Sequence, residues 1–187
     1  VFYLAYAYRI TGDVRYAKRA EEEMLNACSW SDWDPDHWLD TAEVMTALAI
    51  GYDWLYSDLQ QTTRDNIVRA LKEYALEASR NEEDAWFYGR IGNWNQVCNA
   101  GLVCSALAIY EHEPELARVV IEDAVRTNRP AIEGIYGPDG GYPEGPTYWG
   151  FGTIYQVLML SVMEDCFGTD FGLSRAKGFL NTGKFKV

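Results

Sequence analysis

The chain has 187 residues, a formal net charge of -12, 48% hydrophobic residues and 14% aromatic residues. This length suits one domain with a sizeable core, and the apolar and aromatic content excludes an intrinsically disordered segment. The acidic balance argues against a nucleic-acid partner or an anionic membrane surface, and no apolar run reaches the ~18–20 residues that a membrane span needs.

Helices of two kinds alternate along the chain. Residues 1–10, 41–56, 93–110 and 150–163 carry almost no charge, as expected for helices buried on all sides. Residues 13–25, 59–79 and 115–135 instead combine one apolar stripe with a charged face. No run alternates long enough to predict a strand. The sequence therefore predicts an all-α fold in which inner helices alternate with outer helices.

This alternation recurs every ~40–55 residues, which is typical of helical hairpins stacked in a repeat or a closed ring. We expect one domain over residues 1–187. Because Val1 already lies inside a helical pattern without an initiator Met, we also expect the chain to be an excised piece of a longer protein. The long connections, residues 29–40, 81–92 and 136–150, each precede an inner helix. They should gather at one end of the fold, and function should lie there.

The four cysteines are Cys28, Cys98, Cys104 and Cys166. They form no Cys-x-x-Cys pair, and the spacing of Cys98 and Cys104 does not suit ligands on one helical face. The sequence predicts small buried thiols in preference to a metal site or a disulfide framework. We expect no metal and no cofactor.

Six of the seven tryptophans lie in the three long loops or at the adjacent helix starts: Trp30, Trp33, Trp38, Trp86, Trp94 and Trp149. Flat apolar rings rimmed by polar groups are typical of a cleft that binds sugar rings, although aromatic packing within the loops is the alternative. The N-termini of the inner helices would favour a carboxylate or sulfate in such a cleft. Arg90 is the nearest cationic candidate. His37, between Trp33 and Trp38, is expected either to contact sugar or to play a structural role.

Several long motifs, in order, resemble the heparinase II/III-like polysaccharide lyases: WSDWDPDHWLDTAE, GYDWLY, GNWNQVCNAGL, YGPDGGYPEGPTYWGFGT and GTDFGLSRAKGF. The resemblance covers nearly the whole chain. It implies the later part of an incomplete (α/α) toroid, followed in the family by a large antiparallel β-sandwich that this chain lacks. It also implies a periplasmic or secreted location and an acidic polysaccharide as the substrate.

The reaction implied by the resemblance is β-elimination at a uronic acid. Asn93 matches the residue that neutralises the uronate carboxylate, with Asn95 as the alternative, and a helix cap is the structural interpretation of Asn93. Tyr148, in Glu-Gly-x-x-Tyr, matches the catalytic acid or base, whereas simple packing at a helix start is its structural interpretation. The expected substrate-binding residues are Trp33, His37, Trp38, Arg90, Trp94, Asn95, Gln96, Tyr142, Glu144 and Trp149.

The chain departs from the family pattern at one position and lacks a second expected group. Some relatives have Asn-His where this chain has Asn93 and Trp94. Relatives also complete the site with a histidine from the β-sandwich. We therefore expect weak or no activity from the chain alone.

Two other functions remain open at this stage. A glycoside hydrolase would need two facing carboxyl groups, with Asp40, Glu43, Asp53, Asp139 and Glu144 as the candidates. However, Asp40 and Glu43 also have the spacing of a capping box, and Asp53 lies along a helix. A non-catalytic glycan-binding module would require only the aromatic loops.

Overall fold

The computed structural model describes residues 1–81 and 85–185, and the regular structure within these ranges is entirely helical. This confirms the all-α prediction. The α-helices are α1 (Phe2–Thr11), α2 (Val14–Cys28), α3 (Trp38–Leu55), α4 (Gln61–Leu71), α5 (Asn93–Ala108), α6 (Pro114–Ile135) and α7 (Gly145–Phe167). A π-helical segment (Lys72–Glu77) extends α4, and short 3-10 helices cover Ala78–Arg80, Trp86–Gly89, Leu173–Arg175 and Phe179–Lys184.

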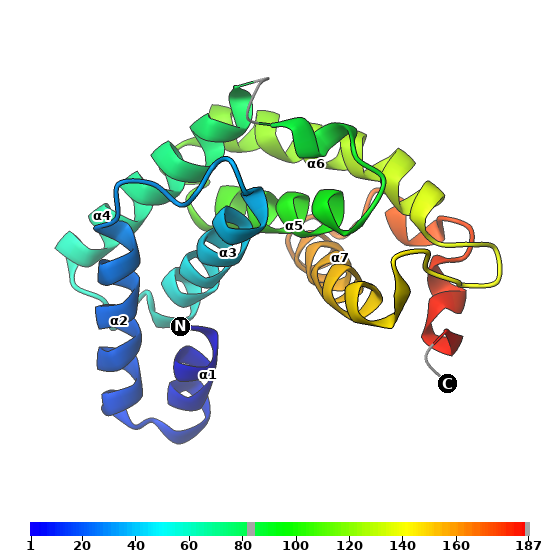
Figure 1. Ribbon diagram of the computed structural model, residues 1–187. Helices are drawn as coiled ribbons and strands as arrows, with labels where there is room; N and C mark the ends of the chain where they lie inside the picture. Colours follow the sequence, from blue (N-terminus) through cyan, green and yellow to red (C-terminus); the bar gives the residue numbers. More distant parts are fainter. Residues whose placement is uncertain (82–84, 186–187) are drawn as a thin grey trace.

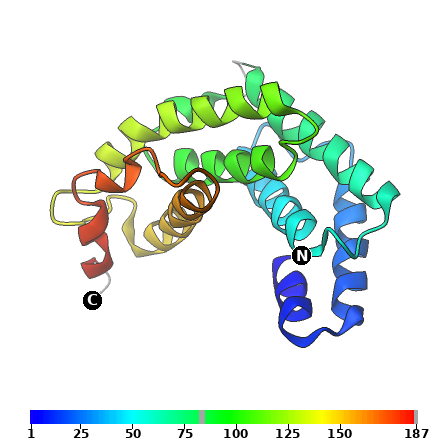
Figure 2. The ribbon, with the colours of Figure 1, turned by 180° about the vertical axis from the view of Figure 1, so that it is seen from behind.

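The helices form a curved arc with two layers (Figures 1 and 2). The charge-poor helices α1, α3, α5 and α7 lie along its inner side, whereas α2, α4 and α6 lie along its outer side. Helix α5 packs against α3, α6 and α7, so it forms the centre of the inner layer. The long charged helices cover this layer from outside because each has a single apolar stripe.

Burial on all sides is confirmed only for α5, most of whose residues are buried. The prediction is wrong for the two inner helices at the ends of the arc. In α1 only Ala5 is buried, and Tyr3 is 83% exposed; in α7 Ile154 is 69% exposed. These helices have an inner-layer neighbour on one side only, so their low charge does not translate into burial.

Two inner helices begin earlier than the sequence pattern predicts. Helix α3 begins at Trp38 with His37 as its N-cap residue, and Asp40 lies in its first turn, where its Oδ2 is 2.9 Å from His37 Nδ1. The prediction that Asp40 and Glu43 form a capping box is therefore wrong. Helix α7 begins at Gly145, with Pro in its first turn, a position that needs no backbone N–H. Tyr148 consequently lies on a helix rather than in a loop.

A buried set of side-chain amides joins the three helices around the candidate site. Asn95 Oδ1 accepts hydrogen bonds from Asn99 Nδ2 at 2.9 Å and from Asn128 Nδ2 at 3.2 Å. Asn128 and Gln156 exchange two hydrogen bonds of 2.9 Å. These side chains come from α5, α6 and α7. Satisfied amides in a low-dielectric core hold their partners in one arrangement, so this network fixes α6 and α7 against α5.

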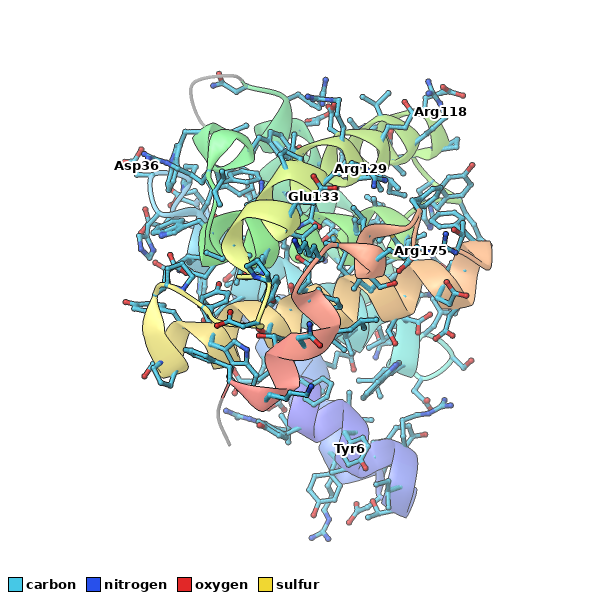
Figure 3. All side chains as sticks on the ribbon, turned by 90° about the vertical axis from the view of Figure 1, so that its right-hand side faces the viewer. Tyr6, Asp36, Arg118, Arg129, Glu133 and Arg175 are labelled. Atoms are coloured by element: carbon cyan, nitrogen blue, oxygen red, sulfur yellow. The ribbon has the colours of Figure 1, made fainter. Side chains whose placement is uncertain are left out.

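The long loops gather at one end, as predicted. In Figure 3, Asp36 of the first loop and the start of α7 lie on the left, while Arg118 near the start of α6 and the end of α7 lie on the right. We call these the N-terminal end and the C-terminal end of the inner layer. Residues 82–84 of the second loop lie outside the described residues.

The prediction of buried thiols is confirmed for Cys28, Cys98 and Cys104, whereas Cys166 is exposed. All four are free thiols. Burial raises the pKa of the Cys28 thiol to about 11, so this group stays protonated and packs as a small apolar side chain. Within residues 1–81 and 85–185, no helix is both long and apolar enough to cross a membrane.

Candidate functional site

The centre of the N-terminal end is a contact between Asn93 and Glu144. Glu144 Oε2 accepts hydrogen bonds from the Asn93 backbone N–H at 3.0 Å and from Asn93 Nδ2 at 2.9 Å. Asn93 is the first residue of α5, and the N-cap residue is Gly92. The interpretation of Asn93 as the helix cap is therefore wrong, because Glu144 from the next loop satisfies this N–H. A carboxylate here also faces the positive end of the α5 dipole.

Gly92 makes this approach possible. A Cβ atom at this position would lie 2.9 Å from Glu144 Oε1, so a larger residue would push the carboxylate away. The third long loop and the start of α5 are thus held together by a close contact that glycine permits.

The Asn93 side chain has an acceptor and a donor hydrogen that Glu144 does not use. Its side chain is buried, with the residue only 3% exposed, and its Oδ1 has no hydrogen-bond partner among the described residues. Its Nδ2 carries two hydrogens, of which Glu144 uses one. Buried polar atoms are usually paired, so an unpaired acceptor beside an available donor is a feature expected of a site prepared for a ligand.

Tyr142 and Gln96 form a hydrogen-bonded row beneath this contact. Tyr142 Oη donates to Gln96 Oε1 at 2.7 Å, Gln96 Nε2 donates to Tyr136 Oη at 2.8 Å, and Tyr136 Oη is 2.9 Å from Thr153 Oγ1. Burial, and then the charge of Glu144, raises the pKa of Tyr142 well above its ordinary value. Tyr142 therefore stays protonated. Tyr142 and Gln96 are 3% and 0% exposed, so they are as buried as Asn93, and a hydrogen bond joins them to each other.

Tyr148 occupies the first turn of α7. It is 51% exposed, and its hydroxyl makes no hydrogen bond with any residue in the described ranges. Gly152 lies one turn later on the same face and approaches α5 so closely that a Cβ there would be 3.1 Å from Asn93 Cβ and 2.4 Å from Gln96 Oε1. Tyr148 and Asn93 thus belong to the same end of the inner layer. The adjacent Trp149 donates from Nε1 to Thr182 Oγ1 at 2.8 Å and packs against the C-terminal segment.

An accessible aromatic strip lies beside Asn93. The ring centroids of His37 and Trp94 are 4.8 Å apart, and those of Trp94 and Trp86 are 4.7 Å apart. The Arg90 guanidinium lies 5.2 Å from the Trp86 ring centroid. His37 and Arg90 are exposed, and both tryptophans are partly exposed. We call these four residues the aromatic strip. The sequence identified Trp86 only as a loop tryptophan, because nothing in the sequence indicates that it contacts Trp94.

Three predicted substrate-binding residues are instead parts of the core. Trp33 is 3% exposed and donates from Nε1 to Ala27 O at 3.0 Å. Trp38 is fully buried against Phe87 because α3 begins with it. Asn95, the alternative neutralising residue, is fully buried, and its Nδ2 lies 3.2 Å from Tyr88 O and 3.3 Å from Thr127 O. None of these side chains presents a surface to a sugar.

The carboxylates proposed for a hydrolase have different surroundings. Asp40 contacts His37, Asp139 Oδ1 accepts the Gly141 N–H at 3.0 Å within its own turn, and Asp53 lines a pocket at the C-terminal end.

A possible metal-binding set lies in the first loop. Ligand atoms of Asp34, His37 and Asp40 lie within 4.8 Å of one another, but all three residues are exposed. The positive end of the α3 dipole also opposes a cation there.

Comparison with known proteins adds no assignment. The chain matches no protein-family model, and no curated protein is significantly similar to it. The chemistry of the N-terminal end is therefore argued from its own residues.

Proposed function

We propose that the chain is the toroid part of a polysaccharide lyase that cleaves a uronic-acid-containing polysaccharide by β-elimination. The observation that carries this proposal is the Asn93 side chain, which is oriented by Glu144 and retains a free N–H and an unpaired Oδ1. The two-layered arc of alternating inner and outer helices supports an incomplete (α/α) toroid as its architecture.

Asn93 is suited to neutralise a uronate carboxylate. The remaining Nδ2 hydrogen can donate to it, and the N-terminus of α5 adds a partial positive charge. Negative charge grows on the carboxylate as the C5 proton leaves, so a donor fixed before reaction stabilises the transition state. Glu144 is a positioning residue in this proposal, because it determines which edge of the Asn93 amide faces the sugar.

Tyr148 is suited to the proton transfers. Its hydroxyl is exposed at the same end as Asn93 and has no protein partner in the described ranges. In the elimination the C5–H bond breaks, a C4–C5 double bond forms, and the C4–O bond breaks. The leaving oxygen takes up a proton and becomes a hydroxyl. We assign to Tyr148 the donation of this proton or the removal of the C5 proton.

The aromatic strip is suited to hold neighbouring sugar units. Trp86 and Trp94 offer partly exposed ring faces, and Arg90 adds a positive charge for an acidic polysaccharide. The same strip favours the second candidate function, a glycan-binding module without catalysis.

The two functions are separated by measuring both binding and eliminative cleavage. Heparan-like and alginate-like polysaccharides are incubated with the protein, and the unsaturated uronate product is followed by its ultraviolet absorbance. Because the resemblance implies that relatives complete the site with a histidine from a β-sandwich, we expect slow product formation from residues 1–187 alone. Tyr148→Phe should lower the rate by about 10²-fold or more while binding is retained, and the matched Tyr16→Phe on α2 should match the wild type.

Three results would overturn all or part of this proposal. Binding without any unsaturated product from the whole panel would favour the glycan-binding module. An unchanged rate for Tyr148→Phe would remove Tyr148 from the chemistry. A product that carries a new reducing end but no double bond would instead indicate a hydrolase.

A further inference from the structure

A pocket lies at the C-terminal end of the inner layer, away from Asn93 and Tyr148. It has a volume of about 520 Å³, which is in the range of small-ligand sites. It lies where α3, α5 and α7 end, at Leu55, Ala108 and Phe167. Its chemically distinctive lining residues are four aromatic and two acidic side chains: Tyr52, Tyr56, Tyr110, Phe167, Asp53 and Glu111.

We propose that this pocket binds a small organic cation that carries an alkylammonium or quaternary ammonium group. Aromatic faces attract such cations through the negative potential above the ring, and carboxylates add a full negative charge. The pocket offers both. This proposal does not depend on the lyase function.

The helix ends reinforce the preference for positive charge. The carboxyl end of an α-helix carries a partial negative charge, which a basic residue in the last turn commonly offsets. Within the described residues, the last turns of α3, α5 and α7 contain no basic residue. Three helix ends without a basic residue in their last turn therefore contribute residues to one pocket.

The aromatic rings are accessible to a ligand. Tyr56, Tyr110 and Phe167 are 43%, 45% and 43% exposed, which is high for large apolar side chains. Tyr52 forms the buried floor, and its ring centroid lies 5.3 Å from that of Tyr56.

The protein already places one cation against this surface. The Arg64 guanidinium lies 4.6 Å from the centroid of Tyr56, and Nη1 donates to Tyr56 O at 3.3 Å. His112 Nε2 lies 3.3 Å from Tyr52 Oη. Arg64 is not a lining residue, so the pocket itself carries only acidic charge.

Calorimetric titration with choline tests the proposal. The comparison ligand is the neutral alcohol in which a carbon atom replaces the choline nitrogen. We expect millimolar binding of choline and at least about threefold weaker binding of the alcohol. The double variant Asp53→Asn with Glu111→Gln should weaken choline binding by about threefold to tenfold. Tyr110→Ala should weaken it while leaving the charge unchanged.

The control is Asp36→Asn, which removes one negative charge from the opposite end, compared with the two removed by the double variant (Figure 3). It should leave choline affinity unchanged, whereas an equal loss in this variant would show that only net charge matters and would overturn the site. The proposal is also overturned if choline does not bind, or if choline and the neutral alcohol bind equally. Circular dichroism spectra confirm that each variant is folded, and all substituted groups are exposed, so folding should be retained.

Discussion

The two ends of the inner layer are built from the same helices but differ in how their polar groups are arranged and in the charge that they favour. At the N-terminal end, buried polar side chains such as Gln96 and Tyr142 are hydrogen-bonded, and a carboxylate from a neighbouring loop lies on the start of α5. At the C-terminal end, tyrosines and carboxylates surround an open pocket. Helix direction decides which charge each end favours. Hydrogen-bond pairing decides whether a buried polar side chain supports the fold, as Asn95 does, or retains capacity for a ligand, as Asn93 does.

The largest predicted effect separates two neighbouring asparagines at the N-terminal end. Asn95→Ala should lower the free energy of unfolding by about 2–4 kcal/mol, because Asn99 and Asn128 would lose a buried acceptor. Asn93→Ala should change it by less than about 1 kcal/mol, because the backbone N–H keeps its bond to Glu144. Urea denaturation measures both values.

Asn66→Ala on α4 is the control for the first value, since Asn66 is exposed and its Nδ2 donates to Thr62 O within the same helix. It should differ from the wild type by less than about 0.5 kcal/mol. Equal losses for Asn93 and Asn95 would show that Asn93 is also structural, and would weaken the distinction between its role and that of the buried network.

The contact between α5 and α7 is tested by a pair of glycines on one helix. Gly152→Ala should lower the free energy of unfolding by about 1–3 kcal/mol, because its Cβ would lie 2.4 Å from Gln96 Oε1 and 2.7 Å from Tyr142 Oη. Gly150→Ala meets nothing within 4 Å and should be neutral or stabilise α7 by up to about 1 kcal/mol. Thermal unfolding compares them. If both variants are equally stable, the close packing that aligns Tyr148 with Asn93 is absent.

The sequence predicted much of the fold because helical periodicity and charge are local properties. Alternating charge-poor and amphipathic segments correctly identified the inner and outer helices, and the lengths of the connections correctly placed the loops at one end. Exposure of α1 and α7 could not be predicted, since it depends on which neighbours each helix has rather than on its own residues.

Individual site residues were harder to predict than the end on which they lie. Trp38 and Trp94 both follow a long loop, yet Trp38 points into the core and Trp94 contacts His37 at the surface. Trp38 is buried because α3 begins at this residue, about one turn earlier than the sequence predicts. The hydrogen bond between Asn93 and Glu144 joins residues 51 positions apart, and the sequence around neither residue indicates it.

Alkaline pH offers a third test, because the buried phenols lie mainly at the N-terminal end. Burial raises the pKa of Tyr88 to about 12, above its ordinary value of 10.0. The folded state then binds more protons than the unfolded state between these values, so the free energy of unfolding falls as pH rises through this window. The slope should be about 1.4 kcal/mol per pH unit for this tyrosine.

Tyr88→Phe keeps the ring and removes the titrating group. Urea denaturation between about pH 9 and about pH 12 should therefore show a shallower decline for the variant than for the wild type. Below about pH 9 the difference between the two proteins should stay constant. A variant that declines as steeply as the wild type would show that the alkaline loss of stability arises elsewhere.

The smallest predicted change in stability tests directly whether the two ends of a helix favour opposite charges. Glu144→Gln removes a negative charge from the N-terminus of α5 and should lower the free energy of unfolding by about 0.5–1 kcal/mol. Asp53→Asn removes the same charge from the last turn of α3 and should raise it by about 0.3–0.5 kcal/mol. Urea denaturation at low salt measures both, and added salt should reduce both differences because it screens charge. If the two substitutions shift stability in the same direction, net charge rather than helix direction governs the carboxylates at the two ends of the inner layer.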